Sequence, residues 1–301
     1  MPVRLIGRVF SGLFLLLVLA AALYGAWMAL DWVDDRNGFG LLDRQPDQPL
    51  VFSSLNRYTR EAAGKASFRR YFTTMVVSEA DPGTPDPPVV TKWERPRVVI
   101  KLLNSGGPGV ASYLRQLVAR LNRMQGEVRF AVGDVAPRIT IRFLSHEAYA
   151  RAIGDGSVGS TRTRYYRSSP GMIRASIAID AGRQGSPGQI KATLIHELTH
   201  AIGGGGHFTS PSYSRRSVLY EASQVTSWSQ NDAAVIRILY SPWIESGMTA
   251  AEARASLRRY ALSADWQHPR RHFEAATRRR AGKSTGRRSQ GDGAWKCFWT
   301  P

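Results

Sequence analysis

Three histidines and a glutamate within one short stretch of this chain are of the types that bind a metal ion and activate water. His196 and His200 are four residues apart, so on a helix their imidazoles lie on one face, one turn apart, and can share an ion. Glu197 lies next to them and can reach a water molecule in an open coordination position. Zinc catalysis requires three protein ligands, an open site and a general base, so the pattern indicates a hydrolytic zinc site.

The third ligand is expected from the residues that follow the helix. Residues 189–195 contain no glycine or proline and are compatible with a helix, whereas four glycines at 203–206 end it, as glycine commonly does at a helix C-terminus. His207 comes directly after the glycines and is the expected third ligand. Glu221 and Asp232, further along the chain, are the alternatives for this position.

Residues 196–207 resemble the pattern of the metzincin clan of zinc metallopeptidases, in which His-Glu-x-x-His-x-x-Gly is followed by a nearby histidine. Residues 217–220, Ser-Val-Leu-Tyr, resemble the Met-turn of that clan, and residues 228–240 resemble the helix that closes many metzincin domains. The resemblance covers residues 90–260 approximately. Residues 239–248 also resemble a bacterial family of unknown function, in which the helix often carries a degenerate form of the motif.

Two positions depart from the metzincin pattern. In that clan the third histidine lies six residues after the second, whereas His207 lies seven residues after His200. The run of four glycines can absorb the extra residue, because glycine tolerates unusual backbone angles. The Met-turn position holds Leu219, a near-isosteric apolar residue that is expected to preserve the floor under the metal.

The resemblance implies hydrolysis of a peptide bond in a protein or peptide substrate, with Zn²⁺ as cofactor. Zinc lowers the pKa of bound water toward neutrality and polarises a carbonyl oxygen. Glu197 is expected to take the proton of that water and pass it to the leaving amine. Tyr220 is the expected second catalytic residue, which would stabilise the oxyanion; a packed aromatic is the alternative for it. Other divalent metals would also bind an imidazole-rich site.

The elements that must position these residues are expected to form an α+β, zincin-like or metzincin-like domain, with a mixed twisted sheet and an active-site helix. Hydrophobic periodicity predicts strands at 97–102, 138–143 and 173–180 and a helix at 110–124. In zincins an edge strand just before the active-site helix pairs with the substrate main chain, and residues 173–180 are expected to be that strand. Residues 154–169 are expected to form an open loop.

Further elements are expected on both sides of this region. Residues 55–72 favour a helix that leads into a short strand at 73–77. Downstream, residues 231–239 and 250–260 favour helices, the second beginning with a capping box formed by Thr249 and Glu252.

The N-terminal region predicts export from the cytoplasm. Residues 9–30 carry no charge, and at ~1.5 Å per residue they are long enough to cross a bilayer as a transmembrane helix. Arg4 and Arg8 precede this segment and Asp31 follows it, so the positive-inside rule places the rest of the chain outside the cytoplasm. A cleaved signal peptide is the alternative. The single cysteine, Cys297, excludes an intrachain disulfide, which suits the periplasmic side of a bacterial inner membrane.

The chain is strongly basic, with 41 Lys and Arg against 23 Asp and Glu and a formal net charge of +18. Much of the excess lies in residues 263–301, which are rich in glycine and serine and are expected to be disordered. Such a tail favours contact with anionic lipid headgroups or acidic wall polymers. An exported location argues against nucleic acid as the partner.

Five segments are expected along the chain. They are a cytoplasmic N-terminus at 1–8, a membrane anchor at 9–30, a linker and N-terminal extension at 31–88, the catalytic domain at 89–262 and the basic tail at 263–301. The expected function is that of a membrane-anchored zinc metallopeptidase. A catalytically inactive zincin-like protein that binds an envelope partner, and a zinc amidase acting on cell-wall peptides, are the alternatives.

Overall fold

The computed structural model describes most of the chain after the N-terminal region. The described residues are 49–77, 88–154, 156–166, 169–208, 216–221, 223–263 and 294–299, with the single positions Leu19 and Ala22. The expected anchor at 9–30 lies outside these residues except for those two positions. Among the described residues, no helix is both long enough and apolar enough to cross a bilayer.

A mixed sheet forms one layer of the fold, with the strand order β2-β1-β3-β5-β4-β6. Strands β2, β1, β3 and β5 run parallel to one another, whereas β4 is antiparallel to both β5 and β6. The strand bounds are β1 Arg97–Leu102, β2 Arg129–Val132, β3 Ile139–Leu144, β4 Gly159–Tyr166, β5 Ser169–Asp180 and β6 Ala294–Trp299.

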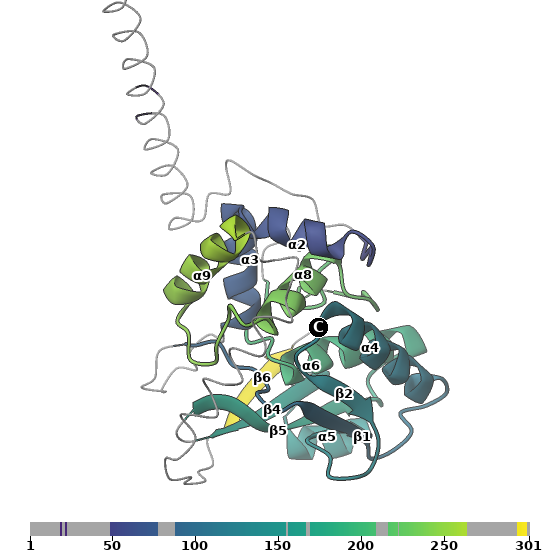
Figure 1. Ribbon diagram of the computed structural model, residues 1–301. Coiled ribbons are helices and arrows are strands. Elements are labelled where there is room, and N and C mark those ends of the chain that lie inside the picture. The colour runs from purple at the N-terminus through teal and green to yellow at the C-terminus, as the bar shows by residue number, and fades with distance from the viewer. Residues whose placement is uncertain are drawn as a thin grey trace, which may run out of the picture.

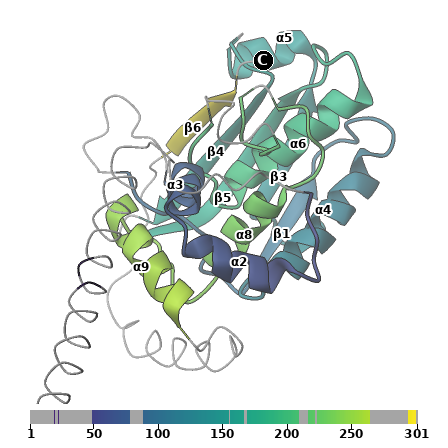
Figure 2. The same ribbon diagram turned by 90° about the horizontal axis from the view of Figure 1, so that it is seen from above.

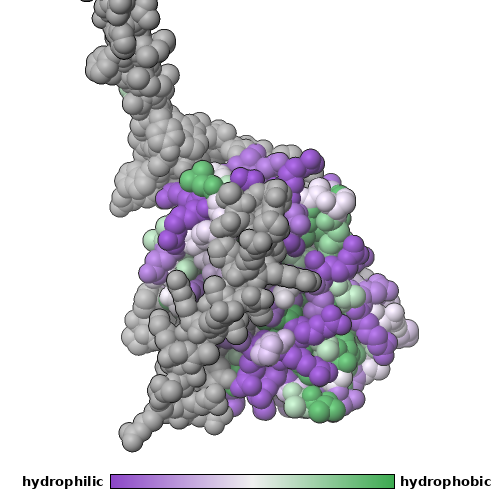
Figure 3. All heavy atoms as spheres, viewed as in Figure 1, coloured by the Kyte–Doolittle hydropathy of each residue, from purple (hydrophilic) through white to green (hydrophobic). Residues whose placement is uncertain are grey.

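Helices cover one face of this sheet in two tiers. Helices α4 and α6 lie next to the strands, and α2, α3, α8 and α9 lie beyond them (Figures 1 and 2). The helix bounds are α2 Leu55–Ala63, α3 Ala66–Val76, α4 Val110–Met124, α5 His146–Ala152, α6 Pro187–Ala201, α8 Gln230–Leu239 and α9 Ala250–Leu262. Hydrophilic residues cover most of the described surface in the view of Figure 3.

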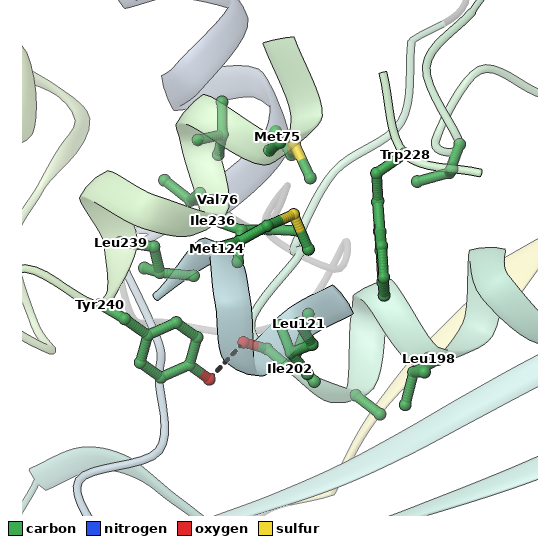
Figure 4. Close-up of a cluster of buried hydrophobic side chains, with 14 of the residues drawn as sticks. Met75, Val76, Leu121, Met124, Leu198, Ile202, Trp228, Ile236, Leu239 and Tyr240 are labelled. Atoms are coloured by element: carbon green, nitrogen blue, oxygen red, sulfur yellow. Dashed lines mark hydrogen bonds between the residues drawn. The ribbon is translucent and has the colours of Figure 1, made fainter. Parts of the chain in front are cut away.

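The hydrophobic core lies between the sheet and the helices. Alternate strand residues such as Val98, Ile141 and Ile177 are fully buried, as expected for strands with one face against a helical layer. Figure 4 shows side chains from α3, α4, α6 and α8 meeting in this core, where the Tyr240 hydroxyl donates to the Ile202 carbonyl at 2.7 Å. That bond ties the end of α8 to the end of α6.

Several expected elements are confirmed. Strands occupy 97–102 and 139–144, and α4 begins and ends at the residues that its periodicity predicts. Helices α8 and α9 also lie where they are expected. Both begin with a capping box, Ser229 with Asp232 in α8 and Thr249 with Glu252 in α9.

The prediction that residues 173–180 form an edge strand is wrong. These residues belong to β5, which pairs with β3 on one side and with β4 on the other. The prediction of an open loop at 154–169 is wrong for residues 159–166, because these form β4. Glycine, serine and arginine favour a loop, but Thr161 and Thr163 alternate with arginines and turn their side chains into the interior.

Two further expectations are corrected. Residues 73–76 complete helix α3 instead of forming a strand, and of the predicted strand only Val77 makes a bridge, to Val90. The expected disorder of the tail is wrong for residues 294–299, because these form β6 along the outer edge of β4. Residues 264–293 lie outside the described part of the chain.

Helices α2 and α3 share the main hydrophobic cluster with residues of the expected catalytic domain. Leu55 of α2 and Phe72 of α3 lie in the same buried cluster as Leu198 of α6 and Ile236 of α8. The helices before the expected boundary near Val89 therefore do not form a separate core.

Candidate metal centre

The side chains of His196, His200 and His207 meet at one point. Their Nε2 atoms are 3.1 Å apart for His196–His200, 3.1 Å for His196–His207 and 3.0 Å for His200–His207. Nitrogen ligands at about 2.0–2.1 Å from a tetrahedral zinc ion lie roughly 3.3 Å apart. The three nitrogens therefore already stand close to the arrangement that a tetrahedral metal ion requires.

Backbone carbonyls fix the orientation of the two helical histidines. The Nδ1 of His196 lies 2.7 Å from the Val218 oxygen, and the Nδ1 of His200 lies 2.8 Å from the Gly204 oxygen. A carbonyl can only accept, so each Nδ1 carries the proton and, in the neutral ring, each Nε2 carries a lone pair. Histidine ligands of metals are commonly oriented by such bonds to their second nitrogen.

The protonation state of the cluster also suits a metal ion. Burial lowers the pKa of His196 to about 3 and that of His207 to about 4, and it lowers the pKa of His200 well below its usual value. All three rings are therefore neutral at pH 7, as metal ligation requires. The Nε2 lone pairs of His196 and His200, 3.1 Å apart, repel one another unless a cation lies between them, so the residues fit a divalent metal.

The glycine run returns the chain from α6 to the cluster. Gly203 has a φ of 112°, which glycine adopts without strain and which turns the chain sharply at the end of α6. The Gly205 N–H donates to the Met75 carbonyl at 2.7 Å, so the loop rests against the end of α3. A Cβ at Gly206 would overlap the Thr74 carbonyl oxygen. Helix α3 and this glycine therefore place His207 beside the other two histidines.

The turn at 217–220 lies directly under His196. The Phe208 N–H donates to the Leu219 carbonyl at 2.9 Å, which joins the chain just after His207 to this turn. Leu219 is fully buried, as expected for an apolar floor. The Val218 carbonyl that orients His196 belongs to the same turn, so the geometry of the turn sets the orientation of the His196 imidazole.

Asp232 holds this turn in place and does not lie among the clustered histidines. Its fully buried carboxylate accepts from the Tyr71 hydroxyl at 2.7 Å, the Ser217 hydroxyl at 2.8 Å, the Val218 N–H at 3.2 Å and the Ser229 N–H at 3.0 Å. One side chain thus joins α3, the turn and the start of α8. The other alternative ligand, Glu221, is exposed. Of the expected candidates, the structure brings together the three histidines.

Glu197 lies buried between α6 and β4. The Thr161 hydroxyl donates to its Oε2 at 2.7 Å, while its Oε1 has no hydrogen-bond partner in the described part of the chain. Gly159 leaves the room that the carboxylate occupies, because a Cβ there would overlap it and come within 2.7 Å of Thr193 Cγ2. Burial raises the pKa of Glu197 to about 8, against the lowering effect of the Thr161 hydrogen bond.

Tyr220 follows the turn, as expected, and is half-buried. Its backbone makes a bridge with Phe208, next to His207. Its hydroxyl makes no hydrogen bond within the described residues, so its role as a stabiliser of an oxyanion stays a prediction.

One family model matches the part of the chain that contains the metal centre and the helices around it. A family model described as a protein of unknown function, DUF2927, matches residues 65–259. The chain belongs to the DUF2927 family. The matched region runs from the start of α3 into α9 and includes the three histidines, Glu197 and Asp232. No curated protein matches the chain.

Membership of DUF2927 agrees with the expected resemblance to a family of unknown function, and the metzincin resemblance stays a prediction. Sequence reasoning missed two residues that lie against Glu197, Thr161 and Gly159, because it assigned their segment to a loop. The alternation of threonine and arginine at 161–164 was the signal that could have revealed the strand.

Proposed function

We propose that this DUF2927 protein is a zinc-dependent metallopeptidase of metzincin type. The observation that carries the proposal is the convergence of three histidine Nε2 atoms within 3.1 Å, two of them oriented by backbone carbonyls. A fold of parallel strands, an antiparallel strand and a helix bearing His-Glu-x-x-His also supports it. Export through the segment at 9–30 would place the site outside the cytoplasm.

The chain's own residues have distinct roles in this proposal. His196, His200 and His207 would hold the ion, which supplies a Lewis acid that activates water and polarises a carbonyl. Once ionised, Glu197 would take the proton from that water with Oε1, because Thr161 already donates to the other oxygen. Thr161 would thereby fix the orientation of the carboxylate, and Gly159 would leave space for it.

Replacing Glu197 by glutamine tests the proposal. We expect Glu197→Gln to bind one zinc ion per chain like the wild type but to hydrolyse peptides about 10²–10⁴-fold more slowly, because an amide cannot accept the proton. Zinc content by elemental analysis and cleavage of a peptide library measure the two effects. The exposed Glu147 on α5 provides the control, since Glu147→Gln should change neither. A wild type that binds zinc and cleaves neither peptides nor wall fragments would favour the binding protein over either hydrolase.

In this proposal, strand β4 would take the place of the expected substrate-binding strand. It lies over Glu197, and its outer edge pairs with β6 from Gly159–Trp299 to Arg164–Ala294. A peptide that binds by adding a strand to β4 would therefore have to displace β6.

Removal of β6 is expected to raise peptidase activity several-fold. A variant that ends at Gly293 frees the backbone groups along the edge of β4, and Lys296→Pro should weaken the same pairing without shortening the chain. The measurement is kcat/KM on an extended peptide, with zinc content as the check on the site. Unchanged activity in both variants, with zinc retained, would show that peptides do not bind along β4.

A further inference from the structure

The face of the sheet that points away from α4 and α6 carries a concentration of arginines. Strand alternation places on it the side chains that lie between the buried ones, and most of these are exposed or half-buried. We call this surface the arginine face and define it by Arg97, Arg129, Arg138, Arg142, Arg164 and Arg174. The only acidic residue in strands β1 to β5 is Asp180, which is fully buried.

The register of the strands arranges these cations in rows. Arg174 pairs with Arg164 across β5 and β4, and Arg138 lies opposite Arg174 because Ile139 pairs with Ala175. A second row lies two residues further along the strands. It consists of Lys101, Thr140, Ser176 and Arg162, each paired with the next. The second row adds hydroxyl donors between two cations.

Three cations of the arginine face have no anionic partner within the described part of the chain. There, Arg138, Arg142 and Arg174 make no ion pair, and the salt bridge on this face joins Lys101 to the exposed Asp134 at 3.2 Å. Like charges directly opposite each other on neighbouring strands destabilise a sheet. The repulsion between these arginines therefore lowers the stability of the fold. An anionic ligand bound between them would reduce that repulsion.

Helix α5 limits the shape of the ligand that can bind to the arginine face. It lies on this same face, at the ends of β3 and β5, where His146 bonds Asp180 at 2.7 Å and Ala178 is buried. Because α5 packs on this face next to the arginine rows, it would keep a flat bilayer surface away from them. A narrow chain could instead lie beside α5 and run across the strands, about 4.8 Å apart, with one anionic group near each guanidinium.

We propose that the arginine face binds a linear polyanion, a chain that bears repeated phosphate or carboxylate groups. Guanidinium groups suit both chemistries because their forked donors pair with two oxygens at once. The proposal is independent of the proposed peptidase activity. It also differs from the expected role of the basic tail, because it rests on strands β1 to β5.

Binding of labelled inorganic polyphosphate to the full chain tests the proposal. In fluorescence anisotropy, the double variant Arg138→Gln/Arg174→Gln should bind at least about 10-fold more weakly, with a shallower dependence on salt. The matched control is Arg115→Gln/Arg120→Gln on α4, which removes the same charge from exposed positions and should change affinity less than about 2-fold. All variants keep the basic tail, so a difference in affinity between them is caused by the arginine face and not by the tail.

The same binding experiment is repeated with two other ligands, polyglutamate and vesicles of anionic lipid. A selective loss of either polymer in the Arg138/Arg174 variant supports the proposal and identifies the phosphate or the carboxylate chain. Equal losses in both double variants would overturn it, because net charge alone would then explain binding. Selective loss of vesicle binding, with polymer binding intact, would also overturn it in favour of a membrane surface. Unchanged zinc content and melting temperature verify folding, and Arg142→Gln replaces the double variant if that variant fails to fold.

Discussion

The variant His207→Ala is expected to lose the metal ion while it keeps its fold. Its imidazole contributes one of the three nitrogens that lie 3.0–3.1 Å apart, and the two remaining histidines leave an incomplete site. Changes to residues that only orient a ligand cost about 10–100-fold in metal affinity, so loss of a ligand should cost at least ~100-fold. Competition with a chromogenic chelator measures the affinity, and elemental analysis measures the zinc content.

The alternative ligand Glu221 provides the comparison for this experiment. Glu221 is exposed and close in sequence, so Glu221→Ala should bind zinc like the wild type. The reverse pattern, with zinc lost in Glu221→Ala and kept in His207→Ala, would assign the third position to the carboxylate. A wild type that binds no zinc after reconstitution would rule out the metal centre itself.

The variant Asp232→Ala is expected to show the largest loss of stability. Its carboxylate accepts hydrogen bonds from Tyr71, Ser217, Val218 and Ser229, all in the interior. Removing it leaves buried donors without an acceptor, which should lower the free energy of unfolding by roughly 3–5 kcal/mol. Urea unfolding of the metal-free protein measures this effect without a contribution from bound zinc.

The same variant should also bind zinc more weakly. The Val218 carbonyl orients His196 only while the turn at 217–220 is held by Asp232, so loosening the turn disturbs a ligand. Asp134→Ala, at an exposed position paired with Lys101, should change stability by less than about 0.5 kcal/mol. A large stability loss in Asp232→Ala with undiminished zinc affinity would contradict the link between the turn and the site.

Local spacing was sufficient for the core of the site. His196 and His200 share a helix face because the helical repeat brings residues four apart together, and this holds in any fold that makes the helix. The end of α6 at the glycines, the capping box of Thr249 and helix α4 follow from equally local preferences. Such features depend on a few adjacent residues, and the sequence displays them directly.

Strand order could not be predicted in the same way. Residues 173–180 alternate between apolar and polar side chains, as an edge strand would. Strand β4 nevertheless pairs with the side of β5 that the prediction left unpaired, because Thr161 and Thr163 pack into the interior. The helical end of α3 was missed because a β-branched run favours a strand in isolation, whereas here its residues pack into the core shared with α8. In both cases burial against distant residues outweighs the local preference.

The sequence by itself determined which residues could ligate a metal, the helix that carries two of them and the residue that could act as a base. Only the tertiary structure decided that His207 joins the cluster while Asp232 holds the turn beneath it. It also decided that Glu197 lies under β4 and that arginines from separate strands form rows. The physical reason is that these outcomes depend on the closing of loops and the register of strands, which bring together residues far apart in the chain.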